Sequence, residues 1–329
     1  MVFFIFFMAA LVTVFAAVKL STYADVISMK STWGGMMVGT ILLAGATSLP
    51  EVTTSLTAVV IDNPDIAIGN VLGSYLFNLF ILAVFDVYYR KKMLFTKTHF
   101  SHIYSALLGI CLVILVILSF ILPLQWSLFR VGMESYLIIL FYGIGIYMLN
   151  KTGGEQLNDE KEVFSDAAKS VSLKRAQIGF VIAAIITLLA GSTLAISGDQ
   201  IALLTGIGST FIGSFLIAAS TSLPEAVAVL IALQLKNPNL AVGSILGSNA
   251  FNMLIISLSD AAYLQGAILQ FVEESHVVSA LSVCLLAVIV MISILLGQKN
   301  VLKRLYILPS IILIILYFVT SYIIFVGLP

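Results

Sequence analysis

Two stretches of this chain repeat each other without a gap, so any fold for it must contain one local structure twice. Residues 39–86 align with residues 213–260 at a fixed offset of 174, with 21 identities over 48 positions. The shared segments include Thr-Ser-Leu-Pro-Glu at 47–51 and 221–225, Asn-Pro at 63–64 and 237–238, and Gly-Ser at 73–74 and 247–248. Similarity of this extent indicates a duplication, and we expect two related halves.

Both copies lie in long apolar stretches. The chain is 60% hydrophobic and 10% charged, whereas a soluble domain carries about 25% charged residues. The runs are continuous, which favours helices over the alternating strands of a membrane barrel. We therefore predict an all-α integral membrane protein with ten transmembrane helices, near residues 2–27, 34–60, 65–88, 100–122, 132–149, 176–198, 208–234, 239–262, 276–296 and 303–327.

The basic residues predict an orientation. With both termini outside, 14 of the 16 Lys and Arg residues fall in inner loops or beside them, as the positive-inside rule requires. Acidic residues mark the opposite side: Asp62, Asp65, Asp199, Glu273 and Glu274. The first apolar segment lacks a basic region before it, so we interpret it as a retained span. We predict a multi-pass protein of the cell (plasma) membrane.

Equivalent points of the two copies are separated by five spans, and five is an odd number. The copies should therefore have opposite orientations, as two inverted five-helix repeats. The predicted parts are an N-terminal half (1–149), a cytoplasmic linker (150–175) rich in polar residues, and a C-terminal half (176–329). Inverted repeats are typical of secondary transporters, whose ion sites lie near the middle of the membrane.

Each copy places a carboxylate inside an apolar span, at Glu51 and Glu225. Such a group is costly, so a function is its default interpretation. The alternatives are a protonated glutamate bonded between helices, or one paired with Lys. Neither helix carries Lys or Arg at similar depth, which weakens the second alternative.

Helical spacing adds other oxygens to these carboxylates. Thr47 and Ser48 share a face with Glu51, and Ser74 and Asn78 share a face of the next helix. Pro50 should kink its helix and free the carbonyl of Ala46. The second copy repeats the set with Thr221, Ser222, Ser248, Asn252, Pro224 and the carbonyl of Ser220. Oxygens alone suit a hard cation such as Ca²⁺, and without His or Cys the set argues against zinc or copper.

Four segments, 45–51, 73–78, 219–225 and 247–252, together resemble the first and second α-repeats of the sodium/calcium exchanger family, in the calcium/cation antiporter superfamily. The resemblance implies a Ca²⁺ site formed by Glu51, Glu225 and the backbone carbonyls of Thr47 and Thr221. It implies Na⁺ sites that use Ala44, Thr47, Ser48, Glu51, Ser74, Ala218, Thr221, Ser222, Glu225 and Ser248, with Asn78 and Asn252 at the centre. Many prokaryotic members have Asp where this chain has Asn252.

The predicted function is antiport of Na⁺ against Ca²⁺ by alternating access. The alternatives are H⁺-coupled exchange of Ca²⁺ or of another divalent cation (Mg²⁺ or Mn²⁺), and a cation channel. No enzymatic motif appears, so we predict neither catalytic residues nor a cofactor. The expected partners are the lipid bilayer and inorganic cations; zero net charge suggests no nucleic acid, and nothing implies a protein partner, which fits a monomer. We expect interfacial positions for His99, His102 and His276, and helix capping or loop solvation for Asp86 and Asp260.

Overall fold

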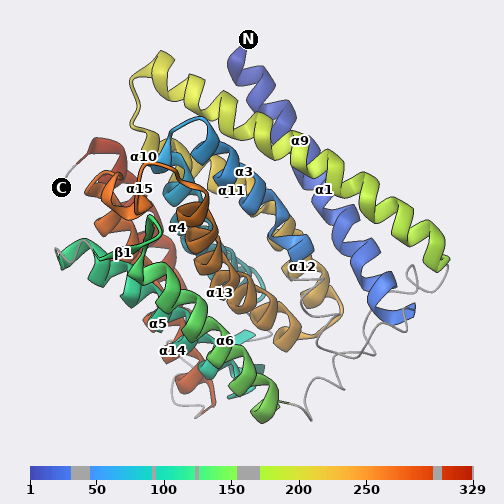
Figure 1. The fold of residues 1–329 in the computed structure, drawn as a ribbon. Helices are drawn as coiled ribbons and strands as arrows, with labels where there is room; N and C mark the ends of the chain where they lie inside the picture. The colour runs from blue at the N-terminus through green and yellow to red at the C-terminus, as the bar shows by residue number, and fades with distance from the viewer. Residues whose placement is uncertain (31–44, 91–93, 123–125, 154–170, 299–305, 328–329) are drawn as a thin grey trace.

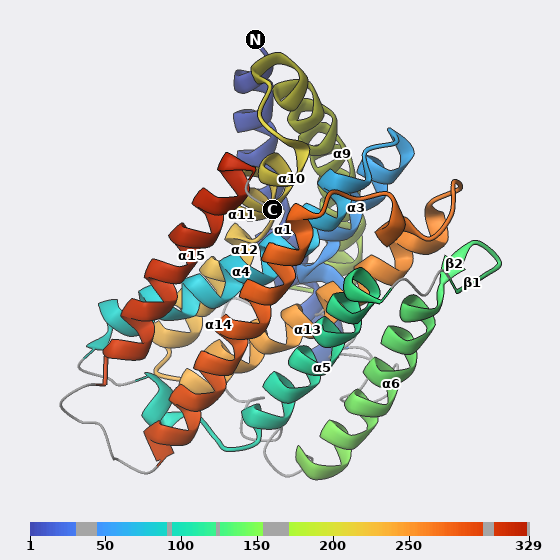
Figure 2. The ribbon, with the colours of Figure 1, turned by 90° about the vertical axis from the view of Figure 1, so that its left-hand side faces the viewer.

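The computed structural model describes residues 1–30, 45–90, 94–122, 126–153, 171–298 and 306–327, and these residues form a bundle of long helices (Figures 1 and 2). The long helices are α1 (Val2–Lys30), α4 (Pro64–Tyr88), α5 (His102–Ile121), α6 (Met133–Gly153), α9 (Leu173–Thr205), α13 (Pro238–Ala262), α14 (Ser275–Gln298) and α15 (Leu308–Val326). The shorter ones are α3 (Leu49–Val60), α10 (Ser209–Phe211), the π-helix η4 (Ile212–Ile217), α11 (Ala218–Thr221), α12 (Leu223–Gln234) and the 3₁₀-helices η2 (Leu94–Lys97) and η5 (Ile268–Gln270). The only strands in the described part of the chain are the antiparallel pair β1 (Ser127–Leu128) and β2 (Val131–Gly132).

Within these ranges, seven helices are long and apolar enough to cross a membrane, or eight if the segments 209–221 and 223–234 count as one span. Those two segments meet at a bend of 41°, so the predicted kink at Pro224 is confirmed. The predicted span at 132–149 corresponds to α6, whose apolar part (Met133–Leu149) is shorter. Part of the predicted span at 34–60 and most of the predicted linker lie outside the described residues.

In the described residues, two helices of each repeat have equivalent bounds. Helices α3 and α12, and likewise α4 and α13, begin and end at positions that differ by 174. The turns between them also match, because Asp62 and Lys236 both adopt left-handed backbone, with φ of 60° and 61°. In each turn the following Asn accepts a hydrogen bond from the backbone N–H three residues later, a standard helix cap, and Pro follows it.

Helices α4 and α13 form the centre of the bundle. Of the most apolar part of each helix, 78% is buried in α4 and 67% in α13, against 22% in α1 and 28% in α15. Helices α1 and α9 pack against each other along one side of the bundle (Figure 1). They run antiparallel, because Val26 near the end of α1 packs with Ala176 near the start of α9.

Glycines let α4 cross the π-helix at very short range. A Cβ atom at Gly73 would lie 2.2 Å from the backbone oxygen of Ser214, and one at Gly69 would lie 3.1 Å from its backbone nitrogen. The two glycines, four residues apart on α4, thus allow the backbones to approach closely. The positions of the first copy that are equivalent to Gly213 and Ser214, residues 39 and 40, lie outside the described residues.

Asp86, at the end of α4, holds the last helix of the other half. The side chain is fully buried and accepts hydrogen bonds from the Ser310 hydroxyl at 2.6 Å, the Tyr306 hydroxyl and the backbone N–H of Leu94. Ser310 belongs to α15, in the C-terminal half. Solvation in a loop is therefore wrong for this residue.

Asp260, at the end of α13, makes the reciprocal contact. Its carboxylate is 1% exposed and accepts from the Ser135 hydroxyl at 2.6 Å and from the backbone N–H groups of Gly132 and Ile268. Ser135 belongs to α6, the last helix of the N-terminal half. Loop solvation is wrong here too, since each aspartate clamps a helix of the opposite half.

Candidate functional site

The helices of both repeats break at a serine inside the bundle, and each break positions a glutamate. Ser48 precedes α3 and Ser222 precedes α12, with nearly identical backbone angles (φ −92°, ψ 7° and φ −92°, ψ 3°). Pro follows two residues later at the helix start, as expected where an N–H is not needed. Glu51 and Glu225 lie in the first turns of these helices, where the helix dipole favours negative charge.

These serines and glutamates have the spacing of a capping box but do not form one. In that motif the Ser hydroxyl and the Glu carboxylate would each bind a backbone N–H of the first turn. Instead, neither serine caps its helix through its side chain. Glu51 and Glu225, 1% and 3% exposed, each keep a buried Oε2 without a hydrogen-bond partner, and Ser48 Oγ has none either. These oxygens are therefore available to a ligand.

One contact joins the two halves directly at this point. The Ser222 hydroxyl donates to Oε1 of Glu51 at 3.2 Å. The equivalent contact, from Ser48 to Glu225, is not made in the described structure, because Ser48 Oγ has no partner. Glu51 and Glu225 are also close enough to repel each other electrostatically. The glutamates thus face one region from opposite halves, although their surroundings differ.

A layer of buried amides lies on the two central helices. Asn78 of α4 donates from Nδ2 to Oδ1 of Asn249 on α13 at 2.9 Å. The Oδ1 atoms of Asn78 and Asn252 are buried and have no hydrogen-bond partner. Asn249 has no counterpart in the repeat, because Tyr75 occupies the equivalent position. The predicted pair of amides is therefore buried in the structure, and Asn249 is an addition that the repeat did not reveal.

Asn70 of α4 is a second addition, and it connects the halves. Its Nδ2 donates to the backbone oxygen of Glu51 at 3.2 Å and to Ser55 Oγ at 2.9 Å, while its Oδ1 accepts from the Thr221 hydroxyl at 3.2 Å. Thr221 Oγ1 also lies 3.3 Å from Ser74 Oγ. The equivalent of Asn70 is Ser244, which donates only to the carbonyl of Ala241 in its own helix. The sequence feature that could have identified Asn70 is an amide beside the repeated motif with no amide at the equivalent position of the other copy.

We expect Asn70→Leu to weaken both the fold and cation binding. The change removes three buried hydrogen bonds of Asn70, and each contributes about 0.5–1.5 kcal/mol to stability. It also frees Thr221 and the backbone of Glu51 to move, so the apparent cation affinity should fall about tenfold, or about 1.4 kcal/mol. Thermal unfolding in detergent and the cation dependence of transport measure the two effects. Ser244→Ala is the matched control, and equal behaviour of the two variants would contradict this role.

Most of the predicted site residues are buried, and one of them lies outside the described residues. Ser48, Glu51, Ser74, Asn78, Ala218, Thr221, Ser222, Glu225, Ser248 and Asn252 are all buried. Thr47 is half-buried just before the first break. Ala44 lies outside the described residues. The ligand roles assigned to these residues stay predictions.

The partnerless oxygens define what the arrangement can bind. Carboxylate, amide and hydroxyl oxygens are ligands for hard cations, and Ca²⁺ takes 6–8 of them at about 2.3–2.6 Å. In the part of the chain that the structure describes, no three His, Cys, Asp or Glu side chains gather into a metal cluster. The site is thus a mixed oxygen set from both halves, around two buried carboxylates.

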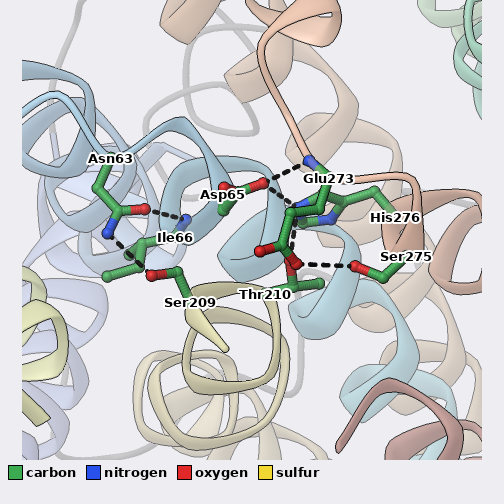
Figure 3. Close-up of polar contacts among 8 residues, drawn as sticks. All are labelled: Asn63, Asp65, Ile66, Ser209, Thr210, Glu273, Ser275 and His276. Carbon is green, nitrogen blue, oxygen red and sulfur yellow. Dashed lines mark hydrogen bonds and ion pairs between the residues drawn. The ribbon is translucent and has the colours of Figure 1, made fainter. Parts of the chain in front are cut away.

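The histidines lie elsewhere, and one of them differs from its predicted setting. His276 sits at the start of α14 but is fully buried rather than an ordinary interfacial residue. Its Nε2 lies 3.2 Å from Oδ1 of Asp65 and 3.3 Å from Oγ1 of Thr210 (Figure 3). Thr210 in turn donates to Glu273 at 2.8 Å. This polar cluster joins the starts of α4, α10 and α14, away from the glutamates.

Comparisons with known proteins agree with this architecture. The family model described as "sodium/calcium exchanger protein" matches residues 1–150 and 176–326. The candidate antiporter CaxA of Alkalimonas amylolytica is 28% identical over 224 residues, covering 67% of this chain and 68% of that protein. The inner membrane protein YrbG of Escherichia coli K12 is 25% identical over 248 residues, covering 75% of each.

Solved structures share the fold at low sequence identity. The sodium-calcium exchanger NCX_Mj aligns with a TM-score of 0.60 and 18% identity, over 98% of this chain and 99% of that one. The H⁺/Ca²⁺ exchanger CAX aligns with a TM-score of 0.61 and 12% identity, over 100% of this chain and 92% of that one. At these identities the likeness concerns the fold alone.

Proposed function

This chain belongs to the sodium/calcium exchanger protein family, and we propose that it is a secondary active antiporter that exchanges Na⁺ for Ca²⁺ by alternating access. One observation carries the proposal. Two buried glutamates, one from each half, keep carboxylate oxygens without hydrogen-bond partners at the breaks of their helices. A buried carboxylate without a partner is costly, and a bound cation would offset that cost.

We propose ten transmembrane helices in two inverted five-helix halves, 1–149 and 176–329, joined by a cytoplasmic linker at 150–175. The constant offset of 174 between α3 and α12, and between α4 and α13, supports the repeat. The antiparallel packing of α1 against α9, the first helices of the halves, supports the inversion. The basic residues support a multi-pass protein of the cell (plasma) membrane with both termini outside. Nothing in this arrangement requires a protein partner or a cofactor, and we propose a monomer.

The proposed Ca²⁺ ligands are Glu51, Glu225 and the backbone carbonyls of Thr47 and Thr221. Hydroxyls and small residues of the two breaks would complete flanking Na⁺ sites, with Asn78 and Asn252 at the centre. The proposed Na⁺ set is Ala44, Thr47, Ser48, Glu51, Ser74, Ala218, Thr221, Ser222, Glu225 and Ser248. Burial of the described members on both sides of the breaks supports this grouping.

Charge explains how the two cations would be coupled. Two ionised glutamates carry a charge of about −2, which one Ca²⁺ or two Na⁺ would neutralise, and a third Na⁺ would leave +1. An empty, doubly negative site is unfavourable to enclose in a medium of low dielectric constant. The loaded protein would therefore change its accessible side readily while the empty protein would not, which makes the process exchange. With three Na⁺ the cycle would respond to membrane potential.

Ca²⁺ uptake into proteoliposomes loaded with Na⁺, beside matched vesicles with only a pH gradient, tests the proposal. Uptake driven by outward Na⁺ is the expected result. Uptake driven by the pH gradient alone would indicate H⁺-coupled exchange instead, in which the two glutamates carry protons. No Ca²⁺ uptake under either gradient would contradict Ca²⁺ as the substrate and direct the assay to Mg²⁺ and Mn²⁺. Downhill flux that needs no counter-ion would indicate a channel.

A further inference from the structure

The repeat extends beyond residues 39–86 and includes the first helix of each half. At the same offset of 174, α1 and α9 share Ala9 and Ala183, Thr13 and Thr187, Leu20 and Leu194, Asp25 and Asp199, and Ile27 and Ile201. Asp25 is the only acidic residue of α1, and Asp199 is the only one of α9. A repeated carboxylate on two otherwise apolar helices calls for a role.

The two aspartates lie at opposite ends of the α1–α9 pair. Lys30 Nζ donates to the carbonyl of Val171 at 2.6 Å, so the end of α1 lies beside the start of α9. Asp25 lies near that end, and Asp199 lies near the other end of α9. At a rise of 1.5 Å per residue, the two carboxylates are roughly 35 Å apart along the pair, a distance similar to the thickness of the apolar core of a membrane.

Asp199 binds the central part of the bundle through Asn63. Asn63 Nδ2 donates to Asp199 Oδ1 at 2.7 Å and to Ser209 Oγ at 3.1 Å. Its own Oδ1 caps α4 by accepting from the N–H of Ile66, and Figure 3 shows the asparagine between Ile66 and Ser209. The cap fixes the amide, so its N–H groups are directed to α9 and α10. At this end the outer pair of helices is fastened to the bundle.

The equivalent contact at the other end is open. Asn237 resembles Asn63 in two ways. The residue before it, Lys236, has left-handed backbone, as Asp62 does, and the Asn237 Oδ1 caps the next helix by accepting from the N–H of Leu240 at 3.0 Å. Its equivalent partner is Asp25, since both positions follow from the offset of 174. In the described residues Asp25 has no hydrogen-bond or ion-pair partner, although the side chain is partly buried. The same two residue types are thus hydrogen-bonded at one end and not at the other.

We propose that Asn63–Asp199 and Asn237–Asp25 are alternating latches that fasten the α1–α9 pair to the rest of the bundle, at one end of the molecule at a time. If the pair moves as a unit, closing one latch opens the other. Each closed state then makes the same type of hydrogen bond, which keeps the two states close in free energy and lets bound cations bias them. The inference rests on the proposed alternating access, and it adds the residues that set which end is closed.

Cross-linking tests the proposal on the full chain in lipid nanodiscs. In a Cys111→Ser, Cys284→Ser background, one pair of cysteines replaces Asn63 and Asp199 and another replaces Asn237 and Asp25. A short bifunctional methanethiosulfonate should link either pair, with Na⁺ and Ca²⁺ changing the ratio. In the protein with all four cysteines, mass spectrometry should find one link or the other in each molecule. Molecules with both links, or an Asn237–Asp25 pair that never links in any cation, would overturn the proposal.

A second measurement removes one latch and observes the other. Asp25→Ala should raise the linking rate of the Asn63 and Asp199 cysteines severalfold, because the competing closed state is lost. Lys19→Ala, an exposed change on the same helix, is the control and should leave the rate unchanged. An unchanged rate in Asp25→Ala would overturn the alternation. Linking does not require transport, so an exchange assay run in parallel separates failure of this inference from failure of the proposed function.

Discussion

Glu51→Gln and Glu225→Gln should each abolish Na⁺-driven Ca²⁺ uptake, with a loss of at least about 100-fold in rate. Each change lowers the charge of the site from about −2 to about −1, so a divalent cation would no longer be neutralised in a buried environment. Ca²⁺ should also stop raising the thermal unfolding temperature, because a ligand stabilises only the protein that binds it. Uptake assays and thermal unfolding with and without Ca²⁺ measure the two effects.

Two features of this experiment separate loss of binding from loss of folding. Without cations, the Gln variants should be at least as stable as the parent, because repulsion between two buried carboxylates is removed. Glu274→Gln is the matched control, since this carboxylate is exposed and outside the site. A double Glu51→Gln, Glu225→Gln variant that still exchanges Na⁺ for Ca²⁺ would rule out the proposed site.

Gly73→Ala should be the most damaging single-methyl change in the described part of the chain. The added Cβ would lie 2.2 Å from the backbone oxygen of Ser214 and 2.4 Å from its Cα, so no side-chain rotation can relieve the overlap. Helix α4 would have to separate from the π-helix that leads to the second break. We expect a loss of about 3 kcal/mol or more in the free energy of unfolding, measured by unfolding in mixed micelles, or no folded protein.

Gly143→Ala provides the comparison, because nothing lies within 4 Å of a Cβ built at Gly143 on the exposed face of α6. It should leave stability within about 0.5 kcal/mol of the parent or raise it, since Ala is the better helix former. Equal stability of the Gly73 and Gly143 variants would show that α4 can move away from the π-helix at little cost.

The features that sequence could predict are those that depend on local chemistry. Proline removes a backbone hydrogen bond wherever it occurs inside a helix. The helix breaks beside Glu51 and Glu225 could therefore be predicted from Pro50 and Pro224. Asn-Pro at 63–64 and 237–238 similarly specifies a cap and a helix start. Family membership was also confirmed, because the repeated motif is long enough to be specific.

The remaining features depend on which helices meet, and a single sequence does not contain that information. Asn70 and Ser244 occupy equivalent positions, yet only the first reaches across to the opposite half. The π-helix at Ile212–Ile217 has no marker in its sequence beyond Gly213. Asp25 and Asp199 could have been found, however, because extending the same offset past the polar motif into plain apolar helices is enough to pair them.

The reciprocal aspartate clamps affect how the protein is made. Asp86 and its partner Ser310 are 224 residues apart, so this clamp cannot close until the ribosome has passed Ser310. The other clamp, between Ser135 and Asp260, spans 125 residues and can close earlier, but only after α13 has been made. Neither half can therefore bury its own aspartate correctly during insertion. In the proposed arrangement of two inverted five-helix halves, the same contacts would also join two separate copies of one half.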